Sequence, residues 1–302
     1  MLDRKKMKTI VTGSSGFIGT RLCCFLQDRG DTVIKVSRTS NPDYKSDLIC
    51  DLETAKLNQG TMSGIDTVFH LAGYAHDLLD PEKSRKRYFK LNVEATKNLA
   101  IQASQEGVKN FIFVSSVKAG SPEDCLAENP SGIYGETKRE AELWLLEFTK
   151  NTDMKLFIVR PSLVYGPNIK GNLSSMKNAI EAGWFPPLPK IKNVRSMIHV
   201  DDLVRAIIFV LEKGLDGEVY NITDGKEYST TEIYETLYAI TGKNPPKFRL
   251  PLSLFSFLRY MPGKFNQTVS KLLGDEKYSS SKIESLGFST KLRFGDMNET
   301  LF

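Results

Sequence analysis

A tyrosine and a lysine stand four residues apart in the segment Tyr134-Gly-Glu-Thr-Lys138. On a helix this spacing puts both side chains on one face, so that the phenol lies beside the ammonium. A phenol has a pKa of about 10 in water, and a neighbouring positive charge favours its ionised form. Such a tyrosine can take a proton from a hydroxyl group while a hydride leaves for a nicotinamide ring. The pair therefore predicts acid–base chemistry coupled to hydride transfer.

A glycine-rich segment near the amino end predicts a cradle for a dinucleotide. The β-branched run at residues 9–12 is typical of a buried strand, and Gly13, Gly16 and Gly19 follow it. The first glycine permits a sharp turn, the second lets the backbone approach a pyrophosphate, and the third lets the helix pack on the strand. The N-terminus of that helix supplies free N–H groups and a positive dipole end.

A serine pair, Ser115-Ser116, closes the apolar strand predicted at residues 110–115. Site residues of parallel α/β sheets lie at the carboxyl ends of strands. Taken alone, the glycines fit an ordinary strand–helix turn, and Tyr134 with Lys138 fits an exposed helix face. The order and spacing of the three features together favour one catalytic site.

Composition and charge narrow the class of protein. The chain has 302 residues, of which 40% are hydrophobic and 25% charged, with a net charge of +5. These values are ordinary for a globular protein of one large or two modest domains. There is no basic stripe with interleaved aromatic residues, which disfavours nucleic-acid binding. The mild positive charge suits anionic substrates such as nucleoside diphosphates.

The cysteines and histidines predict no metal site. Cys23, Cys24, Cys50 and Cys125 form no Cys-x-x-Cys pair, and the three histidines are scattered, so we expect a protein of the reducing cytoplasm. No apolar run is long enough to span a membrane. The short apolar segment at residues 251–261 is typical of core or of a helix, and a membrane-surface patch is the alternative.

Strand-like and helical patterns alternate along the chain, which predicts βαβ units and a parallel sheet. The rhythm breaks after Pro161, where prolines and glycines become frequent. We therefore expect an α/β fold: a doubly wound parallel sheet (Rossmann domain) at 1–166 and 198–224, and a smaller α/β substrate lobe at 167–197 and 225–302. The expected strands are 8–12, 32–37, 48–51, 67–71, 110–115, 156–160 and 218–222, and the expected helices are 16–28, 82–105, 134–150, 174–182, 200–212 and 230–241.

With these motifs, the chain resembles the extended short-chain dehydrogenase/reductases that act on nucleotide sugars, the NAD-dependent epimerase/dehydratase family. Within it, the chain is similar to bacterial UDP-glucose 4-epimerase-like proteins, which include 4-ketoreductases that make sugars for surface polysaccharides. The resemblance runs nearly end to end, through residues 12–19, 51–52, 69–73, 91–96, 114–116, 134–138, 160–167, 171–172 and 195–203.

The resemblance implies roles for individual residues. Ser116 would hydrogen-bond the reacting C4 oxygen, Tyr134 would be the acid and base, and Lys138 would tune it. The implied cofactor-binding residues are Gly13, Gly16, Phe17, Ile18, Gly19, Asp51, Leu52, Leu71, Ala72, Gly73, Asn92, Tyr134, Lys138 and Pro161.

Four further residues are candidates for binding the substrate. Asn172 and Arg195 match positions that grip the nucleoside diphosphate, with a loop cap and a surface ion pair as the alternatives. His76 is either a substrate contact or a structural histidine, and Lys118 is either a substrate contact or a solvated loop lysine.

Two departures from the family pattern carry information. Ser37 and Arg38 end the second strand, where NAD-preferring members have an acidic residue for the ribose hydroxyl. A guanidinium can pair with a 2′-phosphate, so NADP is favoured over NAD; alternatively Arg38 stacks on adenine and NAD binds. Val117 and Lys118 follow the catalytic serine position, where dehydratases carry an Asp-Glu pair. The missing carboxylates disfavour elimination of water.

We therefore expect an enzyme that exchanges hydride at C4 of a UDP-linked hexose bound in a cleft between sheet domain and lobe. It would be a 4-epimerase or a 4-ketoreductase, and the residues favour neither strongly. A non-catalytic dinucleotide-sensing module is the alternative from another class, disfavoured because Ser116, Tyr134 and Lys138 are all present. By analogy with the family, a homodimer would form through helices 82–105 and 134–150.

Overall fold

The structure is a computed structural model that describes residues 6–75, 81–120, 130–169, 171–253, 269 and 272–298, with only the backbone at 81–83. The chain forms two compact units. Unit 1 comprises Met1–Pro161, Leu203–Ile222 and Ser281–Phe288, and unit 2 comprises Ser162–Asp202, Thr223–Ser280 and Ser289–Phe302. Within the described ranges, no helix has the length and apolar character needed to cross a membrane.

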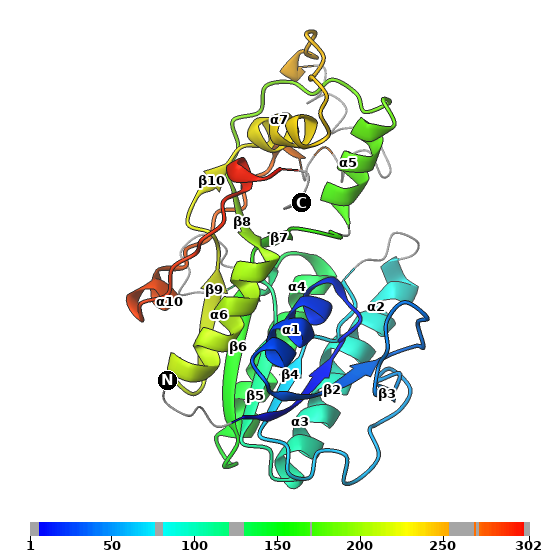
Figure 1. Ribbon diagram of the computed structural model, residues 1–302, viewed down its shortest axis with the longest axis vertical. Coiled ribbons are helices and arrows are strands. Elements are labelled where there is room, and N and C mark those ends of the chain that lie inside the picture. The colour runs from blue at the N-terminus through cyan, green and yellow to red at the C-terminus, as the bar shows by residue number, and fades with distance from the viewer. Residues whose placement is uncertain are drawn as a thin grey trace. The chain divides into compact units, whose positions relative to one another are not determined.

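Unit 1 is built on a seven-stranded sheet in which every neighbouring pair of strands is parallel. The strand order reverses between β1 and β4, which is the switch point where doubly wound sheets bind ligands. The predicted doubly wound parallel sheet is confirmed (Figure 1). In spatial order its strands are β3 (Leu48–Ile49), β2 (Thr32–Ser37), β1 (Lys8–Thr12), β4 (Thr67–His70), β5 (Asn110–Val114), β6 (Lys155–Pro161) and β9 (Glu218–Ile222).

The helices of unit 1 lie close to their predicted bounds, with one difference. The helix predicted at 82–105 contains a π-helical turn, η1 (Lys90–Glu94), between α2 (Pro81–Phe89) and α3 (Ala95–Gln105). Single π turns inside helices are frequent at functional sites, and this one carries the buried Asn92. The other helices are α1 (Phe17–Asp28), η2 (Val117–Ala119), α4 (Gly132–Thr149), α6 (Val200–Lys213) and α10 (Ser281–Ser285).

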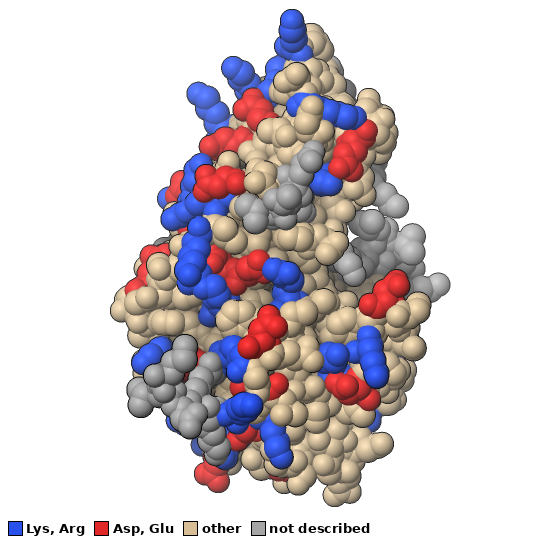
Figure 2. Space-filling model, in the orientation of Figure 1, with Lys and Arg blue, Asp and Glu red and all other residues tan. Residues whose placement is uncertain are grey.

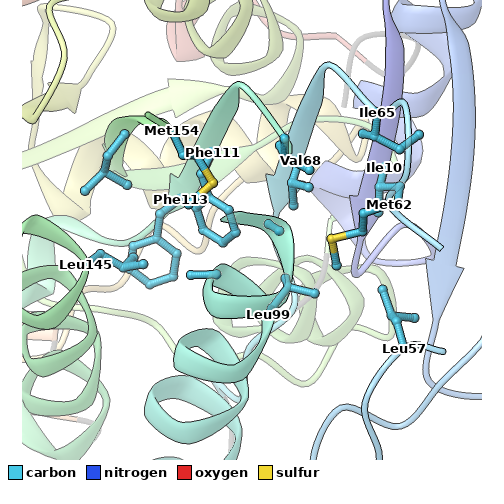
Figure 3. Packing of buried hydrophobic residues seen from close by; sticks show 14 of the residues in the cluster. Ile10, Leu57, Met62, Ile65, Val68, Leu99, Phe111, Phe113, Leu145 and Met154 are labelled. Carbon is cyan, nitrogen blue, oxygen red and sulfur yellow. The ribbon is translucent and has the colours of Figure 1, made fainter. Parts of the chain in front are cut away.

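A hydrophobic cluster fixes α3 and α4 against one face of the sheet (Figure 3). Val68 and Phe111 from neighbouring strands face Leu99 of α3 and Leu145 of α4, and all four are fully or almost fully buried. Burial of each such side chain stabilises the fold by about 1.5–3 kcal/mol. Alternate strand residues such as Ile112 are buried too, as expected of a sheet covered by helices on both faces.

Unit 2 contains a three-stranded sheet in the order β10-β8-β7. These strands, β7 (Leu163–Tyr165), β8 (Arg195–His199) and β10 (Glu227–Tyr228), were not expected from the sequence. The unit also holds α5 (Asn172–Glu181), α7 (Thr230–Ile240) and η4 (Phe294–Asp296). Helix α7 begins with a capping box of Ser229 and Glu232, which satisfies two backbone donors at once.

One carboxyl-terminal segment belongs to unit 1, although the sequence placed all of 225–302 in the lobe. Residues 281–288 pack beside β9 and α6. Lys282 pairs with Glu218 of β9, and the ring of Phe288 lies 5.4 Å from that of Phe209 of α6. No pattern in the sequence predicted this return, because α10 is only five residues long.

Candidate active site

The glycine turn after β1 has the geometry of a dinucleotide cradle. Gly13 has a φ of 68°, and a Cβ there would lie 2.7 Å from the backbone nitrogen of Ala72. A Cβ on Gly19 would lie 2.2 Å from the carbonyl oxygen of Gly13. Both positions therefore need glycine for space, and Gly13 also needs it for its conformation.

Helix α1 begins directly after this turn, with Phe17 and Ile18 in its first turn. Its N-cap is Gly16, so no side chain caps the helix. The N–H groups of the first turn therefore keep their capacity to bind an anion, and the helix dipole adds to it. These features fit the pyrophosphate of a dinucleotide.

The tip of β2 has no carboxylate. Ser37 is buried, and its hydroxyl donates to the carbonyl of Thr39 at 3.0 Å and accepts from Ser46 at 2.7 Å. Arg38 is exposed and has no ion pair with any other described residue. An accessible cation therefore stands where many dinucleotide sites have an acid.

Asp51 and Leu52 lie beyond β3. The Asp51 carboxylate accepts the Glu53 N–H at 3.0 Å and so closes a turn. Leu52 is half-buried against the hydrophobic cluster of unit 1. Both therefore have structural contacts in the protein alone, and their expected place beside adenine stays a prediction.

Asn92 ties together the segments after β4 and at the start of α4. Its side-chain oxygen accepts the Tyr74 N–H at 2.7 Å, and its Nδ2 donates to the Tyr74 carbonyl at 3.0 Å and to Thr137 at 3.1 Å. Gly73, after Leu71 and Ala72, lies against this amide: a Cβ there would be 3.2 Å from Asn92 Oδ1 and 3.6 Å from Lys138 Nζ. The structure thus brings Gly73, Asn92 and Lys138 together.

Ser116 and Tyr134 meet at the carboxyl end of β5. Ser116 is the N-cap of η2, and its Oγ accepts the Lys118 N–H at 3.2 Å. Burial raises the pKa of Tyr134 to about 12, and the Ser116 side chain offsets part of that rise.

Lys138 is almost wholly buried, one helical turn from Tyr134. Its Nζ donates to the Val114 carbonyl at 2.8 Å and lies 4.2 Å from the centre of the Phe113 ring. Burial lowers the pKa of Lys138 to about 7, although the negative charge of Glu142 raises it in part. In the protein alone, this lysine therefore titrates near neutral pH.

The electrostatic balance of the protein alone can be compared with the expectation from the sequence. Lys138 and the positive ring of an oxidised nicotinamide were together expected to favour the Tyr134 phenolate, and in the protein alone the pKa of Tyr134 is raised. Burial penalises the phenolate, and it also drives Lys138 towards its neutral form. Tyr134 is consequently a phenol near neutral pH and can donate a proton.

Several buried groups at this site were missed by sequence reasoning. The ring of Tyr88 lies 6.4 Å from that of Tyr134 and 4.9 Å from that of Tyr74. The imidazole of His70 is hydrogen-bonded to Thr12 at 2.7 Å and to Thr96 at 2.8 Å. Its burial lowers its pKa to about 3, so it is neutral. The sequence offered one indication of Tyr88 as a site residue: it precedes Asn92 by one turn in the predicted helix, so both share a helix face.

A buried ion pair anchors α4, the helix that carries Tyr134 and Lys138. Nε of Arg160 donates to Oε1 of Glu142 at 2.9 Å, and Nη2 donates to Oε2 at 2.6 Å. The two side chains are 1% and 0% exposed. This pair joins α4 to β6, and β6 ends at the buried Pro161.

The candidate substrate residues are distributed over both units. Lys118 is half-buried in unit 1, beside Ser116. Asn172 is exposed at the first position of α5 in unit 2. Arg195 begins β8, where its Nη1 lies 3.1 Å from Glu276, so the surface ion pair named as its alternative is present. His76 lies outside the described residues.

No group of three His, Cys, Asp or Glu side chains that could hold a metal ion occurs within the described ranges.

Comparisons with known proteins agree on one family. The profile of the NAD dependent epimerase/dehydratase family matches residues 9–223. A UDP-glucose 4-epimerase of Vibrio cholerae is 33% identical over 274 residues, covering 84% of this chain and 82% of the relative. The N-acetyl-alpha-D-glucosaminyl-diphospho-ditrans,octacis-undecaprenol 4-epimerase of Escherichia coli O157:H7 is 28% identical over 305 residues, covering 92% and 89%. The structure of the Thermotoga maritima UDP-glucose 4-epimerase with UDP-glucose matches with a TM-score of 0.77 and 25% identity over 97% of each chain.

Proposed function

Because this chain belongs to the NAD-dependent epimerase/dehydratase family, we propose that it moves a hydride at C4 of a hexose carried on a diphosphate, most simply a UDP-hexose. The observation that carries the proposal is the placement of Tyr134 one helical turn from the buried Lys138 on α4, while Lys138 donates to the last residue of β5 and Ser116 follows that strand. The relative from Vibrio cholerae, itself a UDP-glucose 4-epimerase, supports C4 as the reacting carbon.

The residues of unit 1 divide the work of such a reaction. The uncapped first turn of α1 binds the pyrophosphate of the dinucleotide. When bound, the dinucleotide supplies the hydride acceptor and donor. As a phenolate, a form that the positive ring of an oxidised dinucleotide would favour, Tyr134 would take the proton of the C4 hydroxyl during oxidation. As a phenol, it would return that proton to the C4 oxygen during reduction. Ser116 holds that oxygen in line, and Lys138, when protonated, supplies a positive charge one helical turn from Tyr134.

Between the two reactions that remain, we favour a 4-epimerase, because both curated relatives described above are 4-epimerases. An epimerase oxidises C4, lets the 4-keto sugar turn, and returns the hydride to the other face. The specific observation in favour of a 4-ketoreductase is the tip of β2, where exposed Arg38 replaces an acid. That arrangement favours NADP, which a reductase consumes, so NADP or NAD is part of the proposal.

Three further parts of the proposal concern binding, assembly and location. We propose that Asn172 and Arg195 of unit 2 hold the diphosphate, with a phosphate replacing Glu276 on Arg195.

A homodimer through α3 and α4 is supported by Leu143, an exposed apolar residue on α4. The free thiols Cys23, Cys24 and Cys50 suit the reducing cytoplasm.

A product assay tests the proposal. The purified protein is first checked for bound dinucleotide, then incubated with UDP-glucose and UDP-N-acetylglucosamine, or with a 4-keto-6-deoxy sugar nucleotide and NADPH. Interconversion of C4 epimers without net use of cofactor establishes the epimerase. Oxidation of NADPH with the keto sugar establishes the reductase instead. Binding of the dinucleotide without conversion of any sugar would overturn both in favour of a sensing module.

A further inference from the structure

Two surface segments that carry exposed aromatic residues contact helix α7 of unit 2. The ring of Phe185 lies 5.9 Å from the ring of Tyr234, and the guanidinium of Arg249 lies 5.0 Å from the same ring. Their neighbours in sequence, Trp184 and Phe248, are 71% and 66% exposed. Two large aromatic side chains are therefore exposed next in sequence to residues that contact one buried tyrosine.

The end of α5 is fastened to the same place. Nζ of Lys243, just beyond α7, donates to the carbonyls of Ile180 and Glu181. Trp184 follows directly, with its N–H on the carbonyl of Ala179 at 3.1 Å. These bonds hold the backbone that presents Trp184, so its exposure is a property of an anchored segment.

Exposed lysines lie at the start of α7 and next to Phe248. The backbone of Ile191 is bonded to Thr231 of α7 on both its N–H and its carbonyl, which places Lys190 and Lys192 beside the start of the helix. Lys247 precedes Phe248. These three lysines are exposed and form no ion pair with any other residue that the structure describes.

Two of the acidic residues nearby pair with cations, and a third, Glu232, accepts the Ser229 N–H in the capping box of α7. Glu181 pairs with Lys177 at 2.7 Å, and Glu235 pairs with Arg249 at 2.7 Å. The surface is therefore apolar with a positive rim, and Figure 2 shows Lys and Arg side chains projecting from the end of unit 2 that carries α7. We call this surface the α7 patch; it comprises Trp184, Phe248, Lys190, Lys192 and Lys247.

We propose that the α7 patch docks on an anionic membrane surface, where hexoses carried on a lipid diphosphate are available to the enzyme. Tryptophan is enriched at the level of lipid headgroups, and lysines near the surface are attracted by anionic lipids. A second copy of this chain is a poorer occupant, because it would set lysines against lysines. The choice of a lipid-linked substrate rests on the proposed C4 chemistry, and the Escherichia coli relative acts on an undecaprenol-linked sugar.

Vesicle binding tests the docking directly. The full chain is sedimented with vesicles of phosphatidylcholine, and with vesicles that also contain phosphatidylglycerol. We expect binding only to the anionic vesicles, with a loss at high salt. Lys190→Glu combined with Lys192→Glu and Lys247→Glu should weaken binding by at least about tenfold, and so should Trp184→Ser combined with Phe248→Ser.

Leu215→Ser is the matched control, since Leu215 of unit 1 is 62% exposed and lies outside the patch. It should bind vesicles as the wild type does, and every variant should keep the wild-type rate on a free UDP-hexose. Equal binding to neutral vesicles, no binding, or equal loss in the control would overturn the docking. Self-association that the aromatic double variant abolishes would also overturn it, in favour of a second copy.

The outcome for the substrate is read separately. A lipid-diphosphate hexose in anionic vesicles should be converted faster by the wild type than by the lysine variant. If no sugar of any kind is converted while vesicle binding follows the pattern above, the C4 chemistry fails and the docking surface stands. If free UDP-hexose is converted but vesicles are not bound, the C4 chemistry stands and the docking fails.

Discussion

Removing the carboxylate of Glu142 should destabilise unit 1 more than most single substitutions. The Arg160 guanidinium donates two hydrogen bonds to this carboxylate at 2.9 and 2.6 Å, and neither side chain is more than 1% exposed. Glu142→Ala leaves the guanidinium buried without its main counter-charge. Breaking a buried pair in this way costs about 3–5 kcal/mol. For a unit of this size that is a fall in Tm of about 10 °C.

Urea unfolding and calorimetry measure the loss, and a double variant separates its causes. Glu142→Leu combined with Arg160→Met removes both charges and fills the space with apolar atoms, so it should recover most of the stability. Glu142→Gln, which keeps one acceptor, should fall between the wild type and Glu142→Ala. A Glu142→Ala protein within about 1 kcal/mol of the wild type would refute the reasoning, because it would mean that water reaches Arg160 easily.

The same substitution has a second consequence at Lys138. The negative charge of Glu142 raises the pKa of that lysine, so Glu142→Gln should lower it further. Any pH dependence of turnover that reports Lys138 should therefore move to lower pH. A purely structural role for Glu142 would lower the amount of folded protein and leave the pH profile in place.

Four other substitutions test individual residues. Tyr134→Phe should lower turnover by about 10² to 10⁴ and leave dinucleotide affinity unchanged in calorimetry, whereas turnover within about twofold of wild type would remove Tyr134 from the chemistry. Arg38→Asp should shift the ratio of NADP to NAD affinity towards NAD; an unchanged ratio means that Arg38 does not select the cofactor. Arg195→Ala should weaken UDP-hexose binding by about 10- to 100-fold. Glu276→Gln breaks the same ion pair, so if it leaves the affinity unchanged, the loss of affinity comes from the missing guanidinium. Lys138→Met should stabilise the fold below about pH 7, because the unfolded chain keeps the lysine proton up to a pKa of 10.5 while the folded pKa is about 7. Wild-type stability then rises with pH between these values, so in urea titrations the advantage of Lys138→Met should shrink towards pH 10.5.

Features set by local pattern could be predicted from the sequence. The sheet followed from apolar strands that alternate with helices, and the turn at Gly13 followed from glycine spacing. The placement of Ser116 and Tyr134 at one edge of the sheet followed because the carboxyl ends of parallel strands share an edge. Each inference needed only neighbours in the chain or a general rule of topology.

Features set by distant contacts could not be predicted. Arg160 and Glu142 are 18 residues apart, and Thr12 and His70 are 58 apart, so no periodic pattern links them. The short strands of unit 2 were missed because two or three residues carry no alternation; β10 is one example. The direction of the pKa shift at Tyr134 depends on burial, which a sequence does not state.

The pairing of Glu142 with Arg160 affects the electrostatics around Lys138. Lys138 and Glu142 are four residues apart on α4, a spacing that normally lets a lysine and a glutamate pair. In the structure, Arg160 takes both carboxylate oxygens, and Lys138 donates to the Val114 carbonyl instead. A lysine paired directly with its carboxylate would keep its charge more readily at neutral pH. Burial lowers the pKa of Lys138 to about 7, and the negative charge of Glu142 offsets only part of that fall. Arg160 thus bears on the site from a buried position, because it engages the carboxylate that a lysine at this spacing could otherwise bind.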